Sequence, residues 1–114
     1  MNYQEFRKAY SWTLKKYPGT FELFCGDFES FKIGSVKETI YTKSGRGWKK
    51  VTEYTKDVTP AYYFNTVDAV PFFRNLGGRE TVEVGYCVRG YVPLKVSSIS
   101  PDRDKKIVRE FKLF

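Results

Sequence analysis

The clearest pattern of apolar and polar positions lies in the last third of the chain, where three segments alternate with a period of two: 81–88, 91–96 and 106–114. Alternation bounded by glycine, proline and aspartate is typical of β-strands, and the short connections predict antiparallel neighbours. The apolar faces are expected to hold Val82, Val84, Tyr86 and Val88, then Val92, Leu94 and Val96, and finally Ile107, Phe111 and Leu113. Such a sheet needs a helix to cover its apolar face.

The first seventeen residues predict that helix. Asn2 is a good N-cap, Glu5 stands at the capping-box position, and Pro18 followed by glycine ends the segment. Its apolar positions recur every three or four residues, at Phe6, Tyr10, Leu14 and Tyr17. We expect this aromatic stripe to pack on the sheet, with a partner-binding helix face as the alternative.

The middle of the chain predicts further strands. Residues 20–24 form a short apolar segment that indicates a strand, whereas 28–33 fit neither period. Segments 36–42 and 48–56 predict a β-hairpin with a glycine-rich tip. In its second strand we place Trp48, Thr52 and Tyr54 on one side and Val51 on the other.

A second helical region is predicted between residues 57 and 78. Thr59 is suited to cap it, with proline at the first helical position. Pro71 predicts a break, after which Asp68 is expected to cap a short second helix that ends at Gly77. The sequence contains no linker and no internal repeat. It therefore predicts one α+β domain spanning 1–114, with both helical regions packed on antiparallel strands.

The composition of the chain limits the location and the kinds of catalytic or metal site that we expect. The chain is 41% hydrophobic, has no run long enough to span a membrane, and starts without an apolar leader, so we expect a cytoplasmic protein. Cys25 and Cys87 lie far apart, which favours two small buried side chains, with a disulfide or a reactive thiol as alternatives. Histidine is absent, which removes the usual general base near neutral pH and the commonest metal ligand.

The positive charge is concentrated in the first half of the chain, and the hairpin tip is its most distinctive cluster. The net charge is +7, and the first fifty residues hold ten Lys and Arg against five Asp and Glu. The hairpin tip holds four cations, two glycines and an indole, a composition that suits neutralisation of phosphates and stacking of a base. The candidate contact residues there are Lys43, Arg46, Trp48, Lys49 and Lys50. The alternatives are an ordinary exposed loop whose lysines prevent aggregation and a loop that contacts an acidic protein.

No motif indicates an enzyme. The pairs Asp27 with Glu29 and Asp102 with Asp104 have a spacing that Mg²⁺ ligands can use, but neither has a third acidic residue at a recognisable spacing. The polar turn 100–106 is balanced in charge and reads as a solvated turn or a protein-docking loop. We therefore predict a binding protein with no catalytic residues, no metal and no cofactor.

Two stretches carry a resemblance: 64–78 (FNTVDAVPFFRNLGG) and 91–103 (YVPLKVSSISPDR), the latter followed by VREF at 108–111. They resemble small accessory proteins from phages, plasmids and integrative elements of Gram-positive bacteria, and within that group the chain is similar to type II-A anti-CRISPR proteins. The resemblance implies an inhibitor that binds Cas9 or its guide RNA and interferes with their assembly. The alternative is a general RNA- or DNA-binding accessory protein. A monomer and a homodimer both remain open.

Overall fold

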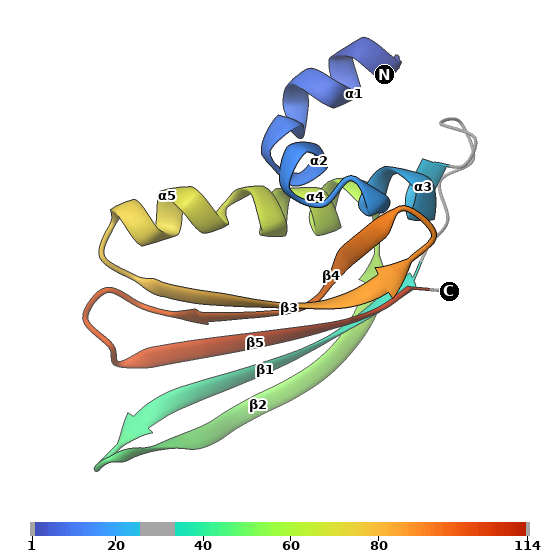
Figure 1. Cartoon of the computed structure of the whole chain (residues 1–114). Helices are drawn as coiled ribbons and strands as arrows, with labels where there is room; N and C mark the ends of the chain where they lie inside the picture. The colour runs from blue at the N-terminus through green and yellow to red at the C-terminus, as the bar shows by residue number, and fades with distance from the viewer. Residues whose placement is uncertain (1, 26–33, 114) are drawn as a thin grey trace.

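The computed structural model describes residues 2–25 and 34–113 and shows an α+β fold built on one five-stranded antiparallel sheet (Figure 1). The strand order is β2-β1-β5-β4-β3, so that β2 and β3 form the two edges. The strands are β1 (Gly34–Ser44), β2 (Gly47–Val58), β3 (Arg79–Cys87), β4 (Gly90–Ile99) and β5 (Lys105–Lys112). The predicted hairpin and the predicted three-strand meander are thus confirmed, and β5 joins them by pairing with both β1 and β4.

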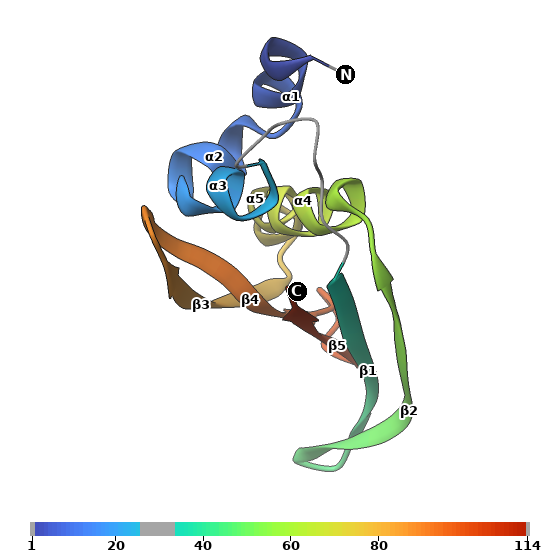
Figure 2. The ribbon, with the colours of Figure 1, turned by 90° about the vertical axis from the view of Figure 1, so that its right-hand side faces the viewer.

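The described helices all lie on one side of this sheet, and none of them covers its other face, which we call the helix-free side (Figure 2). They are α1 (Tyr3–Ala9), α2 (Ser11–Lys16), α3 (Gly19–Cys25), α4 (Pro60–Asp68) and α5 (Val70–Asn75). Helices α4 and α5 run across the sheet, whereas α1 and α2 lie farther out (Figure 1). The far end of the β1–β2 hairpin extends beyond the helices, so both of its faces meet solvent there.

The helix starts follow the predicted capping chemistry at two sites. Asn2 and Glu5 form a complete capping box, and the Thr59 hydroxyl accepts a hydrogen bond from the Tyr62 amide. Pro71 lies in the first turn of α5, as expected, but Asp68 does not cap that helix. Its carboxylate instead accepts two hydrogen bonds from the backbone amide and hydroxyl of Thr13, which ties α2 to α4.

The prediction of a strand at 20–24 is wrong, because this segment lies in α3. Thr20 and Phe24, four residues apart, are both buried, so the buried positions follow a helical period and not an alternation. The Thr20 hydroxyl and amide both donate to the Tyr17 carbonyl, which lets the chain re-enter a helix directly after Pro18. Residues 26–33, including Asp27 and Glu29, lie outside the described part of the chain.

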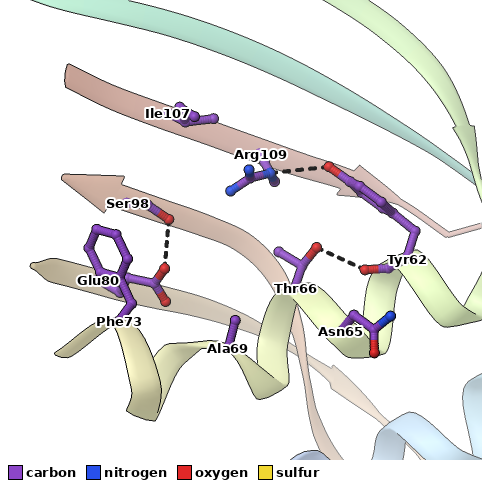
Figure 3. A pocket seen from close by; sticks show the side chains of 9 residues that line it. All are labelled: Tyr62, Asn65, Thr66, Ala69, Phe73, Glu80, Ser98, Ile107 and Arg109. Carbon is purple, nitrogen blue, oxygen red and sulfur yellow. Dashed lines mark hydrogen bonds between the residues drawn. The ribbon is translucent and has the colours of Figure 1, made fainter. Parts of the chain in front are cut away.

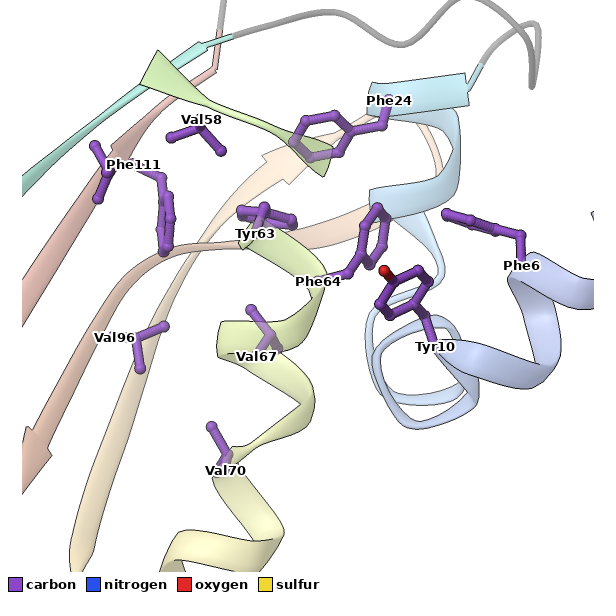
Figure 4. Close-up of a cluster of buried hydrophobic side chains, with 11 residues drawn as sticks. Phe6, Tyr10, Phe24, Val58, Tyr63, Phe64, Val67, Val70, Val96 and Phe111 are labelled. Atoms are coloured by element: carbon purple, nitrogen blue, oxygen red, sulfur yellow. The ribbon is translucent and has the colours of Figure 1, made fainter. Parts of the chain in front are cut away.

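The expected packing of the first helix on the sheet is also wrong. The segment breaks at Tyr10 into α1 and α2, and its aromatic side chains meet other helices. The Phe6 and Tyr10 rings each lie 5.0 Å from the Phe64 ring of α4, measured between centroids. The contact with the sheet is made one layer deeper, where Tyr63 packs on Phe111 of β5 (Figure 4). The core is therefore an aromatic cluster held between two helical layers and the sheet.

Several residues of the β3–β4 hairpin that were predicted to form an apolar, helix-facing surface are exposed. Val82 and Val96 pair across the strands and face the helices, but the alternation does not continue beyond them, because Cys87 and not Tyr86 lies against α3 at the far end of β3. A β-bulge shifts the register next to Val84, and helix α5 reaches only the start of β3. Val84, Tyr86 and Val88 are consequently exposed, and Val88 lies in the turn beyond the strand.

Candidate nucleic-acid interface

The five predicted contact residues all lie at the end of the β1–β2 hairpin, which we call the basic arm and define as residues 43–50. Ser44 pairs with Gly47, so that Gly45 and Arg46 form a two-residue turn. Gly45 has a φ of 58° at the first turn position, a conformation that glycine adopts without strain. The turn therefore holds Arg46 at the extreme end of the arm.

The cross-strand register decides which way each side chain of the arm faces. Val36, Glu38 and Ile40 pair with the helix-facing residues of β5. Tyr41, one residue later, pairs with Lys50 on β2 and with Lys106 on β5, and so faces the helix-free side. Lys43 and its partner Trp48 follow on that same side.

Trp48 is consequently on the opposite side from Thr52 and Tyr54, which corrects the predicted arrangement. The cause is a β-bulge at Val51: Ile40 pairs with Thr52 and the next residue, Tyr41, pairs with Lys50, so that Val51 has no partner on β1. A bulge of this kind breaks the alternation along the strand that contains it.

The helix-free side of the arm combines aromatic rings with cations. The Lys43 ammonium lies 5.1 Å from the Trp48 ring centroid. The Lys106 ammonium lies 5.9 Å from that ring and 5.4 Å from the Tyr41 ring. These distances are within the range of cation–π attraction, which holds the ammonium groups beside the ring faces. Tyr41 and Lys106 were missing from the sequence prediction because only the pairing of β1 with β5 brings them to Trp48.

The charge of the arm is only partly neutralised. Lys50 forms an ion pair with Glu53 at 3.6 Å. Within the described residues, Lys43, Arg46 and Lys49 form no ion pair, and their side chains are exposed. Lys49 pairs with Thr42 and thus projects toward the other face, so the structure brings together Lys43, Trp48 and Lys50 but separates Lys49 from them.

The polar turn 100–106 lies beside the arm. The Lys43 amide donates to the Asp104 carbonyl at 2.9 Å. Within the turn, the Ser100 hydroxyl donates to the Asp104 carboxylate at 2.8 Å, and Arg103 adopts a φ of 60°. Hydrogen bonds involving Ser100 and Asp104 lower the pKa of Asp102. The turn therefore braces the base of the arm.

The structure also bears on the predictions about a metal site, the two cysteines and membrane-spanning segments. Residues 2–25 and 34–113 contain no group of three or more potential ligand side chains that could hold a metal ion. Cys87 carries a free, half-buried thiol 3.5 Å from the Gly19 carbonyl, while the side chain of Cys25 lies outside the described part. Among the described helices, none combines the length and apolar character needed to cross a membrane.

Comparison with protein-family models, with curated proteins and with solved structures found no match to this chain. The resemblance of segments 64–78 and 91–103 to anti-CRISPR proteins is therefore neither supported nor opposed by a related protein.

Proposed function

We propose that this chain is a non-enzymatic protein that binds a single strand of nucleic acid along its basic arm. The observation that supports the proposal is the array on the helix-free side, in which the Lys43 and Lys106 ammonium groups lie beside the Trp48 and Tyr41 rings. Aromatic rings offer bases a stacking surface, and the neighbouring cations neutralise phosphates and release counterions.

The exposure of the arm favours a strand over a folded protein surface as the ligand. Both faces of the hairpin end meet solvent, and Arg46 and Lys49 add unpaired charge at the turn and on the second face. A flexible strand can follow cations around such an end, whereas an acidic protein surface would engage one face. These features alone support the proposal of a general role in binding RNA or DNA.

For the biological target we propose the guide RNA of Cas9, which makes the protein an inhibitor of CRISPR-Cas9 encoded by a mobile genetic element. The support for this step is the resemblance of segments 64–78 and 91–103 together with the affinity for RNA that the arm suggests. Sequestered guide RNA would be withheld from Cas9 before assembly. Direct binding to the Cas9 protein is the competing possibility.

The arm is tested by combining Arg46→Glu with Lys49→Glu and measuring binding to poly(U) by fluorescence anisotropy between 50 and 200 mM salt. Each phosphate contact to a single strand contributes about 0.7 to the slope of log affinity against log salt, so loss of two contacts should reduce that slope by about 1.4 or more. Trp48→Ala should weaken binding by about 1–3 kcal/mol, the stacking contribution of one base.

The matched control is Lys8→Glu with Lys15→Glu, which makes the same change in net charge at exposed helical positions outside the arm. If the arm and control variants bind poly(U) equally well, the arm is not the interface. If both variants match the wild type, the proposed binding mode is wrong.

The target is tested by adding the protein to guide RNA before or after Cas9 and measuring DNA cleavage. Sequestration of the guide predicts inhibition only when the protein is added first, with the inhibition lost in the Arg46→Glu, Lys49→Glu variant. Inhibition that survives this variant, or retention of guide-free Cas9 on the tagged protein after nuclease treatment, would instead support direct binding to Cas9.

A further inference from the structure

A cleft separate from the basic arm lies between the α4–α5 helices and the helix-facing side of β3, β4 and β5 (Figure 3). Its volume is about 420 Å³, within the range of sites that bind small organic ligands. Tyr62, Ala69 and Phe73 line it from the helices, and Glu80, Ile107 and Arg109 line it from the strands. None of the residues that line this cleft belongs to the arm.

The Glu80 carboxylate gives the cleft an unsatisfied hydrogen-bond acceptor. The residue is only 9% exposed, and its Oε1 accepts a hydrogen bond from the Ser98 hydroxyl at 2.8 Å. Its Oε2 has no hydrogen-bond partner in the described part of the chain. Burial raises the pKa of Glu80, and the hydrogen bond from Ser98 together with the charges of Arg109 and Arg74 offsets this only in part. A buried oxygen without a partner is costly, and an N–H group from a ligand would remove that cost.

The Arg109 guanidinium gives the cleft donors. Its Nε donates to the Tyr62 hydroxyl at 3.1 Å, which fixes the orientation of the planar group. Its two terminal nitrogens make no hydrogen bond to any described residue, and Figure 3 shows them turned toward the space between helices and strands. A guanidinium held in this way can donate two parallel hydrogen bonds to neighbouring acceptors.

The two charges together select the kind of ligand. Arg109 and Glu80 do not form an ion pair with each other, and the Arg109 Nε lies 4.0 Å from the Glu38 carboxylate outside the cleft lining, so the cleft itself holds one side chain of each sign. An anion would be repelled by Glu80 and a cation by Arg109, whereas a neutral planar group with both donors and acceptors satisfies both. The Phe73 ring and Ile107 supply apolar surface for the faces of such a group.

We propose that the cleft binds one unstacked guanine base, with the base N–H donors on Glu80 and the O6 and N7 acceptors on Arg109. Unstacked bases are commonly read on these edges, and arginine paired with O6 and N7 is the most frequent specific contact to guanine. The proposal rests on the proposed function, because the strand that the arm binds would supply the base after passing around the end of the hairpin to the helix-facing side of the sheet.

The other bases fit less well. Adenine and uracil each carry one acceptor on either side of the donor that would meet Glu80, so Arg109 could reach only one of the two. Cytosine offers two acceptors, but its single ring covers less of Phe73. We therefore expect guanine to bind at least about tenfold more tightly than adenine or uracil, which is within the discrimination that one bidentate contact gives.

The experiment is a titration of ¹⁵N-labelled protein with guanosine, adenosine, cytidine and uridine, followed by NMR. These nucleosides carry no phosphate and so report on the cleft and not on the charge of the arm. Guanosine should cause saturable shifts at the amides of Ala69 and Phe73. Ala69→Trp, between α4 and α5, fills the cleft and should abolish them, whereas Ala61→Trp on α4 outside the cleft should leave them unchanged. Glu80→Gln should weaken guanosine binding about five- to 150-fold.

Guanosine binding by Ala69→Trp at the wild-type level would overturn the proposal, as would equal affinity for the four nucleosides in the wild type. Should Ala69→Trp fail to fold, an unchanged guanosine affinity in Glu80→Gln would have the same consequence. The two ligands separate the two proposals, because poly(U) lacks guanine and guanosine lacks phosphate. Loss of guanosine binding alone would refute only the cleft, and absence of poly(U) binding alone would refute only the arm.

Discussion

The substitution Glu38→Gln tests the charged cluster that joins β1, β2, β5 and α4 beneath the helices. Glu38 is 4% exposed, and its carboxylate accepts hydrogen bonds from the hydroxyls of Tyr54 and Tyr62. The Lys56 ammonium lies 3.1 Å from it and the Arg109 Nε 4.0 Å. Glutamine keeps the size of the side chain but removes the negative charge and places an amide donor beside two cations.

The expected loss is about 2–4 kcal/mol of unfolding free energy at pH 7. Hydrogen bonds to a charged group contribute about 1.5–3 kcal/mol each, and removing one partner from a buried charge pair costs about 3–5 kcal/mol. The loss should stay below the upper end of these ranges because the Lys56 side chain is 43% exposed and its interaction is screened by water.

The pH dependence of the effect has a defined sign. Burial alone raises the pKa of Glu38, but the hydrogen bonds from Tyr54, Tyr62 and Lys56 outweigh burial and hold the pKa below its ordinary value of 4.5. An acid with a depressed folded-state pKa stabilises the fold above its unfolded-state pKa, and this contribution is lost as pH falls through the folded-state pKa. The difference between wild type and Glu38→Gln should therefore be full at pH 7 and shrink below about pH 4.5.

Urea unfolding of both proteins at pH 7 and pH 3 measures this difference. Glu53→Gln on β2 is the control, because its ion pair with Lys50 is exposed and should contribute about 0–1 kcal/mol. A loss in Glu38→Gln no larger than in this control would refute the reasoning, and so would a loss that is the same at the two pH values.

A pair of glycine substitutions tests the packing of the backbone, and a third substitution tests a buried charge. Gly34→Ala would place a methyl group 2.3 Å from the Lys112 carbonyl oxygen and should cost about 1–3 kcal/mol in urea unfolding, whereas Gly47→Ala, whose nearest new contact is 3.9 Å away, should cost far less. Glu80→Gln should stabilise the protein relative to wild type at pH 7 but less so near pH 4. Burial raises the folded-state pKa of Glu80, so ionisation at higher pH weakens the wild-type fold. A stability difference that does not change with pH would contradict this account.

Local signals in the sequence predicted the elements whose ends are set by nearby residues. Asn2 and Thr59 cap their helices, and the alternating segments became strands, because each signal acts within a few residues. The segment 20–24 was predicted wrongly because its few apolar residues fit a strand as well as a helix, and contacts with distant residues decide between them. Asp68 likewise meets Thr13, which is 55 positions away, and no local pattern reports such a contact.

The arm shows how a correct set of residues can still be placed on the wrong face. Strict alternation along β2 predicts that Trp48 lies on the same face as Thr52 and Tyr54. The segment 49–53 contains neither glycine nor proline, so its sequence does not indicate the bulge at Val51. The pairing of Trp48 with Lys43, and of Tyr41 with Lys106, fixes the face through partners on two other strands. Had the alternation held, the indole would have turned toward the helices, away from Tyr41 and Lys106. The stacking surface proposed here thus depends on a single extra residue in an edge strand, in keeping with the frequency of bulges at sheet edges and beside functional sites.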